Sequence, residues 1–330
     1  MKILVTGAAG FIGAFLTKRL SRLPDVQLLA IDNFTPYYSP DLKLRRVAAL
    51  IPSHVRFEKI DIADGGAVQD CLQTFKPDHV IHLAAQPGIR LELPAHYRYV
   101  DSNLTGFSNV LISSQRVGVE NFMYASSSSV YGRASGEKLR ESASQLRPTS
   151  FYGATKLANE ILARSYSDRY GIKTRGLRFF TVYGPWGRPD MAYFRIIASL
   201  ILKRKFTLFG DGSVQRDFTF IDDVVSLTER LSLDLHLRSD GFSDVVNVGG
   251  GSPISMVKAI NVLSQLTGVP LEIERGESDP SDMRITDADS SYLFSLIGKH
   301  DFWNSEAGLQ VALEWGLNSV TPKELAEWTT

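Results

Sequence analysis

Short apolar runs alternate with longer segments of helical pattern through the first half of the chain. The apolar runs predict buried strands at Ile3–Val5, Val26–Ile31, Val55–Ile60, His79–Leu83, Phe122–Ser126 and Thr174–Phe179. Apolar residues recur at three- and four-residue spacing between them, which is typical of amphipathic helices, in Phe15–Leu23, Gly66–Phe75, Leu104–Val117 and Tyr152–Tyr170. Strands that alternate with helices favour right-handed crossovers and a parallel sheet covered on both faces. We therefore predict an α/β fold built on a doubly wound parallel sheet.

This alternation breaks after about residue 180. Residues 183–190 form a loop rich in glycine and proline, and Phe209–Ser213 predicts a turn between two strand-like pieces. Helical and strand patterns return at Asp222–Leu233 and Val245–Val248. We therefore predict two domains. The first comprises residues 1–180 plus 220–249, and a smaller α/β substrate domain comprises residues 181–219 plus 250–330.

Composition excludes several classes of partner. Lys and Arg number 36, as do Asp and Glu, so the 330-residue chain has no formal net charge. A neutral chain has no overall attraction to nucleic acid or to an anionic membrane. No apolar run reaches the roughly 18 residues of a membrane-spanning helix, so we expect no membrane partner. The single cysteine, Cys71, excludes an internal disulfide and favours a cytoplasmic location.

Three glycines follow the first predicted strand and begin the first helix. Gly7, Gly10 and Gly13 are spaced three apart, with Phe11 and Ile12 between the last two. Glycine lets the backbone turn sharply and lets a pyrophosphate approach the N–H groups at a helix N-terminus. The strand before and the helix after this loop indicate a dinucleotide-binding loop of the Rossmann type.

A carboxylate ends the second predicted strand. Asp32 can accept hydrogen bonds from the adenosine ribose hydroxyls and would repel a 2′-phosphate, which favours NAD over NADP. Asp61 and Ile62, after the third strand, are placed to flank the adenine. The small residues among Leu83, Ala84 and Ala85 leave room for a dinucleotide that crosses the edge of the sheet.

Tyr152 and Lys156 are four residues apart in a predicted helix, so their side chains lie on one face. Tyrosine has an ordinary pKa of about 10 and is a poor base at neutral pH. A neighbouring ammonium favours the phenolate and lowers that pKa. Ser127 lies in the serine run that ends the fifth strand, at the carboxyl edge where doubly wound sheets bind ligands. A hydroxyl there can relay a proton from a substrate alcohol to Tyr152, so we predict these three residues to be catalytic.

Histidine spacing gives no indication of a metal site. His79 and His82 lie three apart on one predicted strand and therefore point to opposite faces. The remaining histidines form no spaced cluster. We expect no metal ion.

These motifs resemble those of the extended short-chain dehydrogenase/reductases, and more closely the NAD-dependent nucleotide-sugar epimerases, in particular the UDP-glucuronate 4-epimerases. The resemblance covers nearly the whole chain. The stretches that carry it are the glycine loop, Asp32–Phe34, Tyr37–Lys43, Leu83–Gln86, Ser126–Gly132, Tyr152–Lys156, Phe179–Met191 and Gly210–Phe218. The resemblance implies NAD as the cofactor, a UDP-sugar as the substrate, and 4-epimerisation through a transient 4-keto sugar.

The resemblance also implies roles for single residues. Tyr152 matches the base, Lys156 the lysine at the nicotinamide ribose, and Ser127 the hydroxyl at the sugar 4-hydroxyl. The other substrate contacts that it implies are Ser128, Ser129, Thr181, Arg90, Arg188, Met191, Arg216 and Asp279, with Arg188 and Arg216 at the pyrophosphate or uridine. The other cofactor contacts are Asn33 and Lys43. Because the stretch Gly276–Asp279 departs from the family's usual acidic pair, either Glu277 or Asp279 meets the ribose.

Sister reactions begin with the same step at C4. A 4,6-dehydratase needs an acid and a base after the serine, where this chain has Ser128 and Ser129, and neither hydroxyl has a suitable pKa. A UDP-glucuronate decarboxylase shares the substrate, but the stretch after Gly187 is similar to the epimerase version. A UDP-glucose or UDP-N-acetylglucosamine 4-epimerase stays an alternative. A catalytically silent dinucleotide sensor is disfavoured because Tyr152 and Lys156 are both present.

The resemblance also implies a homodimer. Two of the predicted helices, Leu104–Val117 and Tyr152–Tyr170, would pair with their copies across a two-fold axis.

Overall fold

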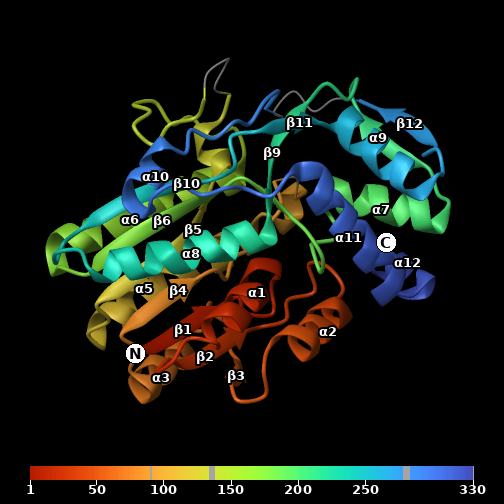
Figure 1. Cartoon of the computed structure of the whole chain (residues 1–330). Helices are drawn as coiled ribbons and strands as arrows, with labels where there is room; N and C mark the ends of the chain where they lie inside the picture. The colour runs from red at the N-terminus through yellow and green to blue at the C-terminus, as the bar shows by residue number, and fades with distance from the viewer. Residues whose placement is uncertain (90, 134–137, 278–282, 330) are drawn as a thin grey trace.

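The computed structural model describes residues 1–89, 91–133, 138–277 and 283–329. A parallel sheet of seven strands forms its centre, in the order β10-β6-β5-β4-β1-β2-β3 (Figure 1). The strands are β1 (Lys2–Thr6), β2 (Gln27–Asp32), β3 (Arg56–Lys59), β4 (His79–His82), β5 (Asn121–Ser127), β6 (Lys173–Phe179) and β10 (Ser243–Val248). All neighbouring strands are parallel. The predicted doubly wound sheet is therefore confirmed.

Helices cover both faces of this sheet, as Figure 1 shows. On one face α1 (Phe11–Leu20) packs against α8 (Ile221–His236); on the other lie α3 (Gly65–Phe75), α5 (Phe107–Arg116) and α6 (Phe151–Tyr170). Along β1, Ile3 and Val5 belong to the first core and Leu4 to the second. Burial on both faces explains the continuous apolar runs in β1 and β2, whereas the edge strand β3 keeps charged, partly exposed residues. In the described part of the chain, no helix is long and apolar enough to cross a membrane.

Two helical segments differ from the sequence pattern. Helix α2 (Pro40–Leu50), between β2 and β3, was not predicted because its buried face includes the charged residues Lys43 and Arg46. The helix predicted at Leu104–Val117 begins earlier than expected. A short helix α4 (Tyr97–Tyr99) and a π-helical segment η2 (Val100–Gly106) lead into α5. A π-helical segment is often associated with a functional site.

The second half of the chain adds two small sheets. The first has the order β11-β9-β7 and the second pairs β12 with β8. Their strands are β7 (Thr181–Tyr183), β8 (Phe206–Phe209), β9 (Gln215–Phe220), β11 (Pro253–Ser255) and β12 (Ile273–Gly276). The helices that accompany them are α7 (Ala192–Leu202), α9 (Met256–Thr267), α11 (Ser305–Ser319) and α12 (Pro322–Trp328). The strands predicted on either side of the Phe209–Ser213 turn are confirmed, whereas the domain bounds stay a prediction.

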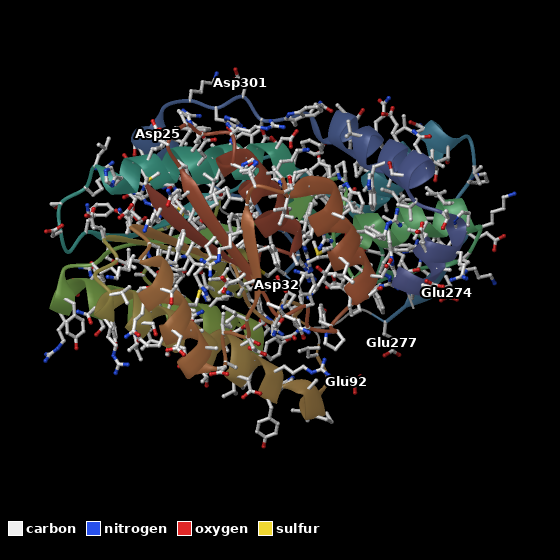
Figure 2. The ribbon with its side chains drawn as sticks, turned by 90° about the horizontal axis from the view of Figure 1, so that it is seen from below. Asp25, Asp32, Glu92, Glu274, Glu277 and Asp301 are labelled. Carbon is white, nitrogen blue, oxygen red and sulfur yellow. The ribbon has the colours of Figure 1, made fainter. Side chains whose placement is uncertain are left out.

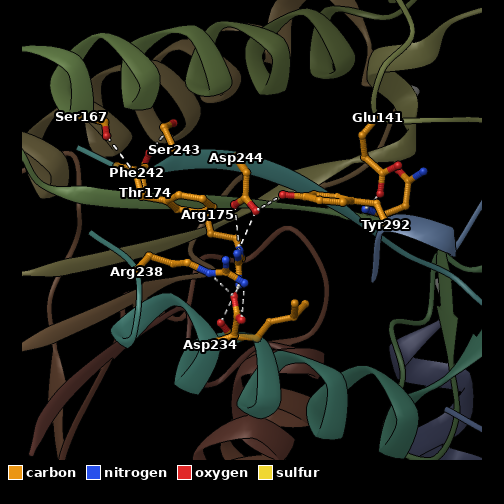
Figure 3. A network of polar contacts seen from close by, with 12 residues as sticks. Glu141, Ser167, Thr174, Arg175, Asp234, Arg238, Phe242, Ser243, Asp244 and Tyr292 are labelled. Carbon is orange, nitrogen blue, oxygen red and sulfur yellow. Dashed lines mark hydrogen bonds and ion pairs between the residues drawn. The ribbon is translucent and has the colours of Figure 1, made fainter. Parts of the chain in front are cut away.

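A buried ionic network joins strand β6 to its neighbour β10 and to helix α8 (Figure 3). The guanidinium of Arg175 in β6 donates to both carboxylate oxygens of Asp244 in β10, each at 2.8 Å, and to Asp234 in α8 at 2.8 Å. The hydroxyl of Tyr292, in α10 (Ser291–Ile297), donates to Asp244 at 2.9 Å. Arg238 also pairs with Asp234, so two cations balance two carboxylates. This balance makes burial of the charges tolerable.

Candidate active site

The glycine loop crosses from β1 into α1 in a conformation that only glycine fits. Gly7 has a φ of 71°, and a Cβ there would lie 2.6 Å from the backbone nitrogen of Ala84. A Cβ on Gly13 would lie 2.1 Å from the Gly7 carbonyl oxygen. Gly10, the N-cap of α1, offers no side chain to the first-turn N–H groups. These features suit a pyrophosphate at the helix N-terminus, so the residues fit a dinucleotide.

Asp32 ends β2 beside this loop, near the middle of the molecule in Figure 2. Its carboxylate oxygens accept one hydrogen bond each, from the N–H of Ala9 at 3.0 Å and of Phe34 at 2.7 Å. Each oxygen keeps a further lone pair for a ribose hydroxyl. The ammonium of Lys43 donates to the Thr35 carbonyl at 2.9 Å, and burial lowers its pKa while Asp32 opposes that shift.

The other predicted cofactor residues lie along the same edge of the sheet. The side-chain amide of Asn33 donates to Asp61 at 3.0 Å, which joins the ends of β2 and β3. Ile62 is buried, and Ala84 after β4 donates from its N–H to the Thr6 hydroxyl at 3.1 Å. Residues that are far apart in sequence therefore share the carboxyl edge of four adjacent strands.

Helix α6 places Tyr152 in its first turn and Lys156 one turn later. The N-cap Ser150 accepts a hydrogen bond from the N–H of Gly153 at 3.0 Å, which fixes where the helix begins. The ammonium of Lys156 donates to the carbonyl of Ala125 in β5 at 2.9 Å. It lies 5.8 Å from the centre of the Tyr152 ring. Burial lowers the pKa of Lys156 to about 8.

The groups that favour the Tyr152 phenolate are Arg188 and Ser127. Burial raises the pKa of Tyr152, while the charge of Arg188 and a hydrogen bond with Ser127 act in the opposite direction. The sequence predicted that Lys156 supplies this charge. That role of Lys156 stays a prediction: its ammonium lies 5.8 Å from the centre of the Tyr152 ring and donates to the Ala125 carbonyl.

Arg188 is itself held by a carboxylate. Its Nε donates to Asp190 at 3.0 Å and its Nη2 donates to the other oxygen of Asp190 at 2.5 Å. The hydroxyl of Tyr37 also donates to Asp190, at 3.1 Å. The bidentate pair fixes the plane of the guanidinium, which remains partly exposed. The assignment of Arg188 to the pyrophosphate or uridine stays a prediction.

A group of hydroxyls lies close to Tyr152. The Ser127 hydroxyl donates to the Ser129 hydroxyl at 3.1 Å and accepts from the Ser129 N–H at 3.1 Å. Ser128 and Ser129 belong to a short 3-10 turn, η3 (Ser128–Tyr131). In the sheet register, Ser127 is opposite Phe179, two residues before the partly exposed Thr181. The adjacent ends of β5 and β6 thereby bring the four predicted hydroxyl residues to one region.

The remaining predicted contacts are more dispersed. The guanidinium of Arg216 in β9 donates to the carbonyls of Gln215 at 2.9 Å and Met283 at 2.6 Å. Met191 is the N-cap of α7, and its N–H donates to the Arg188 carbonyl at 3.2 Å. Glu277 is exposed directly after β12 (Figure 2). Arg90 and Asp279 lie outside the described residues.

Sequence reasoning missed Asn103. Its side chain is buried in the π-helical segment, where it accepts from the Gln86 N–H at 2.8 Å and donates to the Thr155 hydroxyl at 3.1 Å. It therefore connects the loop after β4 to the turn of α6 between Tyr152 and Lys156. A polar residue at a buried helical position was the only available signal.

The histidines of β4 are packing residues. The Nδ1 of His82 lies 2.8 Å from the Thr6 hydroxyl, and that of His79 lies 3.0 Å from the Ser232 hydroxyl. Burial lowers the pKa of each to about 3, so both rings are neutral. Among the described residues, no group of three or more His, Cys, Asp or Glu side chains is arranged to hold a metal ion.

Comparison with known proteins agrees with this arrangement. The NAD dependent epimerase/dehydratase family matches residues 3–249. A probable UDP-glucuronate 4-epimerase of Rhizobium meliloti is 35 % identical over 332 residues, covering 96 % of this chain and 96 % of its own. UDP-glucuronate 4-epimerase 5 of Arabidopsis thaliana is 35 % identical over 347 residues, covering 99 % of this chain and 78 % of its own.

A solved structure extends the likeness to three dimensions. It is UDP-glucuronic acid 4-epimerase from Bacillus cereus in complex with UDP-glucuronic acid and NAD. It superposes with a TM-score of 0.88 at 34 % identity, over 96 % of this chain and 98 % of that one. Together with the glycine loop and the Tyr152–Lys156 helix, these matches show that the chain belongs to the NAD dependent epimerase/dehydratase family.

Proposed function

We propose that this protein catalyses the NAD-dependent 4-epimerisation of a UDP-sugar, with UDP-glucuronate converted to UDP-galacturonate through a 4-keto sugar. The observation that carries the proposal is the helix that bears Tyr152 and Lys156, which the hydrogen bond from Lys156 to Ala125 joins to β5 at the carboxyl edge of the sheet. The relatives named above, and the ligands of the Bacillus cereus structure, support the choice of substrate. NAD bound at this edge supplies the oxidant that accepts hydride from C4 and returns it.

Tyr152 acts as the base in this proposal. It removes the proton of the 4-hydroxyl directly or through Ser127, and it returns a proton to the same oxygen when the ketone is reduced. Arg188 stabilises the phenolate, since a cation beside a tyrosine favours its charged form. Lys156, held by the Ala125 carbonyl, reaches the nicotinamide ribose and keeps the helix in register with β5.

The hydroxyls near Tyr152 hold the sugar carboxylate. A 4-keto glucuronate is a β-keto acid. It loses CO2 when the bond to its carboxylate is free to align with the π system of the 4-keto carbonyl. We propose that Ser127, Ser128 and Thr181 hold the carboxylate out of that alignment, each such bond contributing about 1.5–3 kcal/mol. Arg188 adds a cation on the same side.

The far end of the substrate is held while the sugar turns. We propose that Arg216 binds the pyrophosphate or uridine, together with Arg90 and Asp279, which lie outside the described residues. The guanidinium of Arg216 is oriented by its hydrogen bond to the Met283 carbonyl at 2.6 Å. An anchored nucleotide lets the ketone present its second face without leaving the protein.

The test is incubation with UDP-glucuronate and NAD, followed by NMR of the product sugar. UDP-galacturonate without net NADH supports the proposal. CO2 with a UDP-pentose as the main product would establish a decarboxylase instead, and faster turnover of UDP-glucose would refute the carboxylate role of the hydroxyls. Thr181→Ala should slow epimerisation and raise the decarboxylated share, whereas the matched control Thr181→Ser, which keeps a hydroxyl, should not.

We also propose that the protein is a homodimer formed through α6. Phe151, Ala154 and Ile161 lie on one exposed face of this helix at spacings of three and seven, and Ile161 is 63 % exposed in its middle. An exposed apolar stripe of this kind fits a two-fold related copy. Ile161→Arg should give monomers in sedimentation, whereas Leu237→Arg, at an 82 % exposed site after α8, should leave the dimer intact.

A cytoplasmic location is proposed from the state of Cys71. This side chain is buried with a free thiol, and burial raises its pKa to about 11, so it is inert. A chain with one buried thiol does not depend on an oxidising compartment. Cell fractionation tests this location.

A further inference from the structure

Arg46 in α2 is a fully buried cation that lies between the two halves of the site. Its side chain has no solvent exposure, and no carboxylate in the described part of the chain forms an ion pair with it. Each of its five N–H groups instead has a neutral acceptor. Nε and Nη2 donate to the Trp186 carbonyl at 3.0 and 2.7 Å, and Nη2 also donates to Gly187 at 3.3 Å. Nη1 donates to the Ala9 carbonyl at 2.7 Å and to the Tyr38 hydroxyl at 2.9 Å.

Three of these acceptors, Ala9, Trp186 and Gly187, belong to two loops with different proposed ligands. Ala9 lies inside the glycine loop, between Gly7 and Gly10. Trp186 and Gly187 come directly before Arg188, whose charge acts on Tyr152. A single guanidinium therefore joins the dinucleotide loop to the loop that carries the cation of the sugar site.

The loop that contains Trp186 and Gly187 depends on the hydrogen bonds from Arg46 for its conformation. Trp186 has a φ of 60°, a left-handed conformation that a bulky residue adopts only when its surroundings impose it. At the next residue, a Cβ on Gly187 would lie 1.6 Å from the Tyr193 hydroxyl, so the loop is tightly packed there and leaves no room for a side chain. Two hydrogen bonds from Arg46 to one carbonyl hold the strained residue in place.

The charge of Arg46 is also unmatched by the protein. Asp190 pairs with Arg188, and Lys43 interacts with Asp32. Arg46 remains as one net positive charge beside the N-terminus of α1. A buried cation with only neutral partners is costly unless an anion approaches, and the dinucleotide pyrophosphate is the anion that this loop fits.

We propose, on the basis of the function proposed above, that Arg46 is a positioning residue that couples dinucleotide binding to the alignment of Arg188 on Tyr152. Binding of the pyrophosphate fixes the glycine loop and compensates the charge of Arg46. The fixed guanidinium holds the Trp186 and Gly187 carbonyls, and these set the place of Arg188. Loss of Arg46 should therefore weaken dinucleotide binding and raise the pKa of Tyr152 together.

The test compares Arg46→Met and Arg46→Lys with the wild-type holoprotein. NAD affinity is measured by calorimetry, and the Tyr152 pKa by ultraviolet difference titration against the corresponding Tyr152→Phe protein. Arg46→Met should weaken NAD binding about tenfold or more and raise the Tyr152 pKa. Arg46→Lys retains the charge but cannot reach all four acceptors, so it should retain more NAD affinity and still raise the Tyr152 pKa.

Arg230→Met is the matched control. Arg230 lies in α8 and donates to the carbonyl of Ile297 in α10, so its loss should alter stability and leave the Tyr152 pKa unchanged. An unchanged Tyr152 pKa in folded Arg46 variants would overturn the coupling, and if Arg46→Met does not fold, Arg46→Lys decides. Neither readout requires turnover, so absence of epimerase activity in the wild type would refute the proposed function without deciding this coupling.

Discussion

The ammonium of Lys156 donates a 2.9 Å hydrogen bond to the carbonyl of Ala125. Ala125 is two residues before Ser127 on β5, and Lys156 is one helical turn after Tyr152 on α6. This single bond therefore sets the register between the strand that carries the proposed relay hydroxyl and the helix that carries the proposed base. It also keeps a cation in a buried place, which has consequences for stability.

Lys156→Met should abolish turnover and change how stability depends on pH. The pKa of Lys156 is about 8 in the folded protein and 10.5 ordinarily, so the unfolded chain binds more protons between these values. Wild-type stability should therefore gain up to about 3 kcal/mol from this group as the pH rises through that window. The variant should lack this gain. Urea unfolding of the NAD-free proteins at pH 7.5 and 9.5 measures the difference, and identical pH slopes would contradict it.

Tyr152→Phe should lower kcat by about 10²–10⁴-fold while UDP-sugar binding persists, because only the proton acceptor is removed. Calorimetry and a coupled assay measure the two quantities. Tyr99→Phe is the matched control. The Tyr99 ring lies 6.2 Å from that of Tyr152, but its hydroxyl donates to the Gly88 carbonyl. Retention of a tenth of wild-type activity by Tyr152→Phe would assign the base elsewhere.

Asp32→Asn should weaken NAD binding and narrow the preference for NAD over NADP. The amide keeps an acceptor for one of the two N–H donors but loses the charge that repels a 2′-phosphate. We expect the dissociation constant for NADP divided by that for NAD to fall about tenfold, as for the loss of one charged contact. Asp64→Asn, which also removes one carboxylate but lies at the N-cap of α3, serves as the control. Wild-type protein that purifies with bound NADP would contradict the assignment.

Glu160 and Arg178 should prove strongly coupled in a double-mutant cycle. Arg178 donates to both oxygens of Glu160, at 2.9 and 2.8 Å, and Ser126 donates to the same carboxylate at 2.5 Å. Removal of either partner leaves a buried charge unpaired and should lower the free energy of unfolding by about 3–5 kcal/mol. Replacing both with Met should cost less than the sum of the two.

The exposed pair Lys258–Glu306, between α9 and α11, is the reference for that cycle. Both of its side chains are more than half exposed, so its coupling should be at most about 1 kcal/mol. Equal coupling energies for the two pairs, measured by denaturant unfolding, would show that burial does not strengthen the first.

Local patterns accounted for much of the fold and the site. The inner strands β1 and β2 are buried on both faces, so their central residues form continuous apolar runs. The glycine loop and the Tyr152–Lys156 pair depend on spacing within one turn or one helix, which a sequence displays directly.

Interactions between distant segments were not predictable in this way. Helix α2 carries its charged residues inward, because Arg46 finds carbonyl acceptors in loops about 40 and 140 residues away. The loop that carries Arg188 follows β7, which pairs with β9 in a separate sheet, a pairing that no local pattern displays. Asn103 satisfies groups of the β4 loop and of α6 that are known only from the folded chain.

Two crossings between the main sheet and the smaller sheets are unusually tight. Phe180 alone separates β6 from β7, and its N–H donates to the Val248 carbonyl at 3.3 Å, while β9 continues into α8 without a linker. Such short connections contribute few free backbone torsions, so they restrict hinge motion between the main sheet and the smaller sheets. We therefore expect the sugar to turn inside walls of nearly constant shape, and we expect the volume of side chains such as Thr181, rather than an angle of closure, to set how large a C6 substituent the protein accepts.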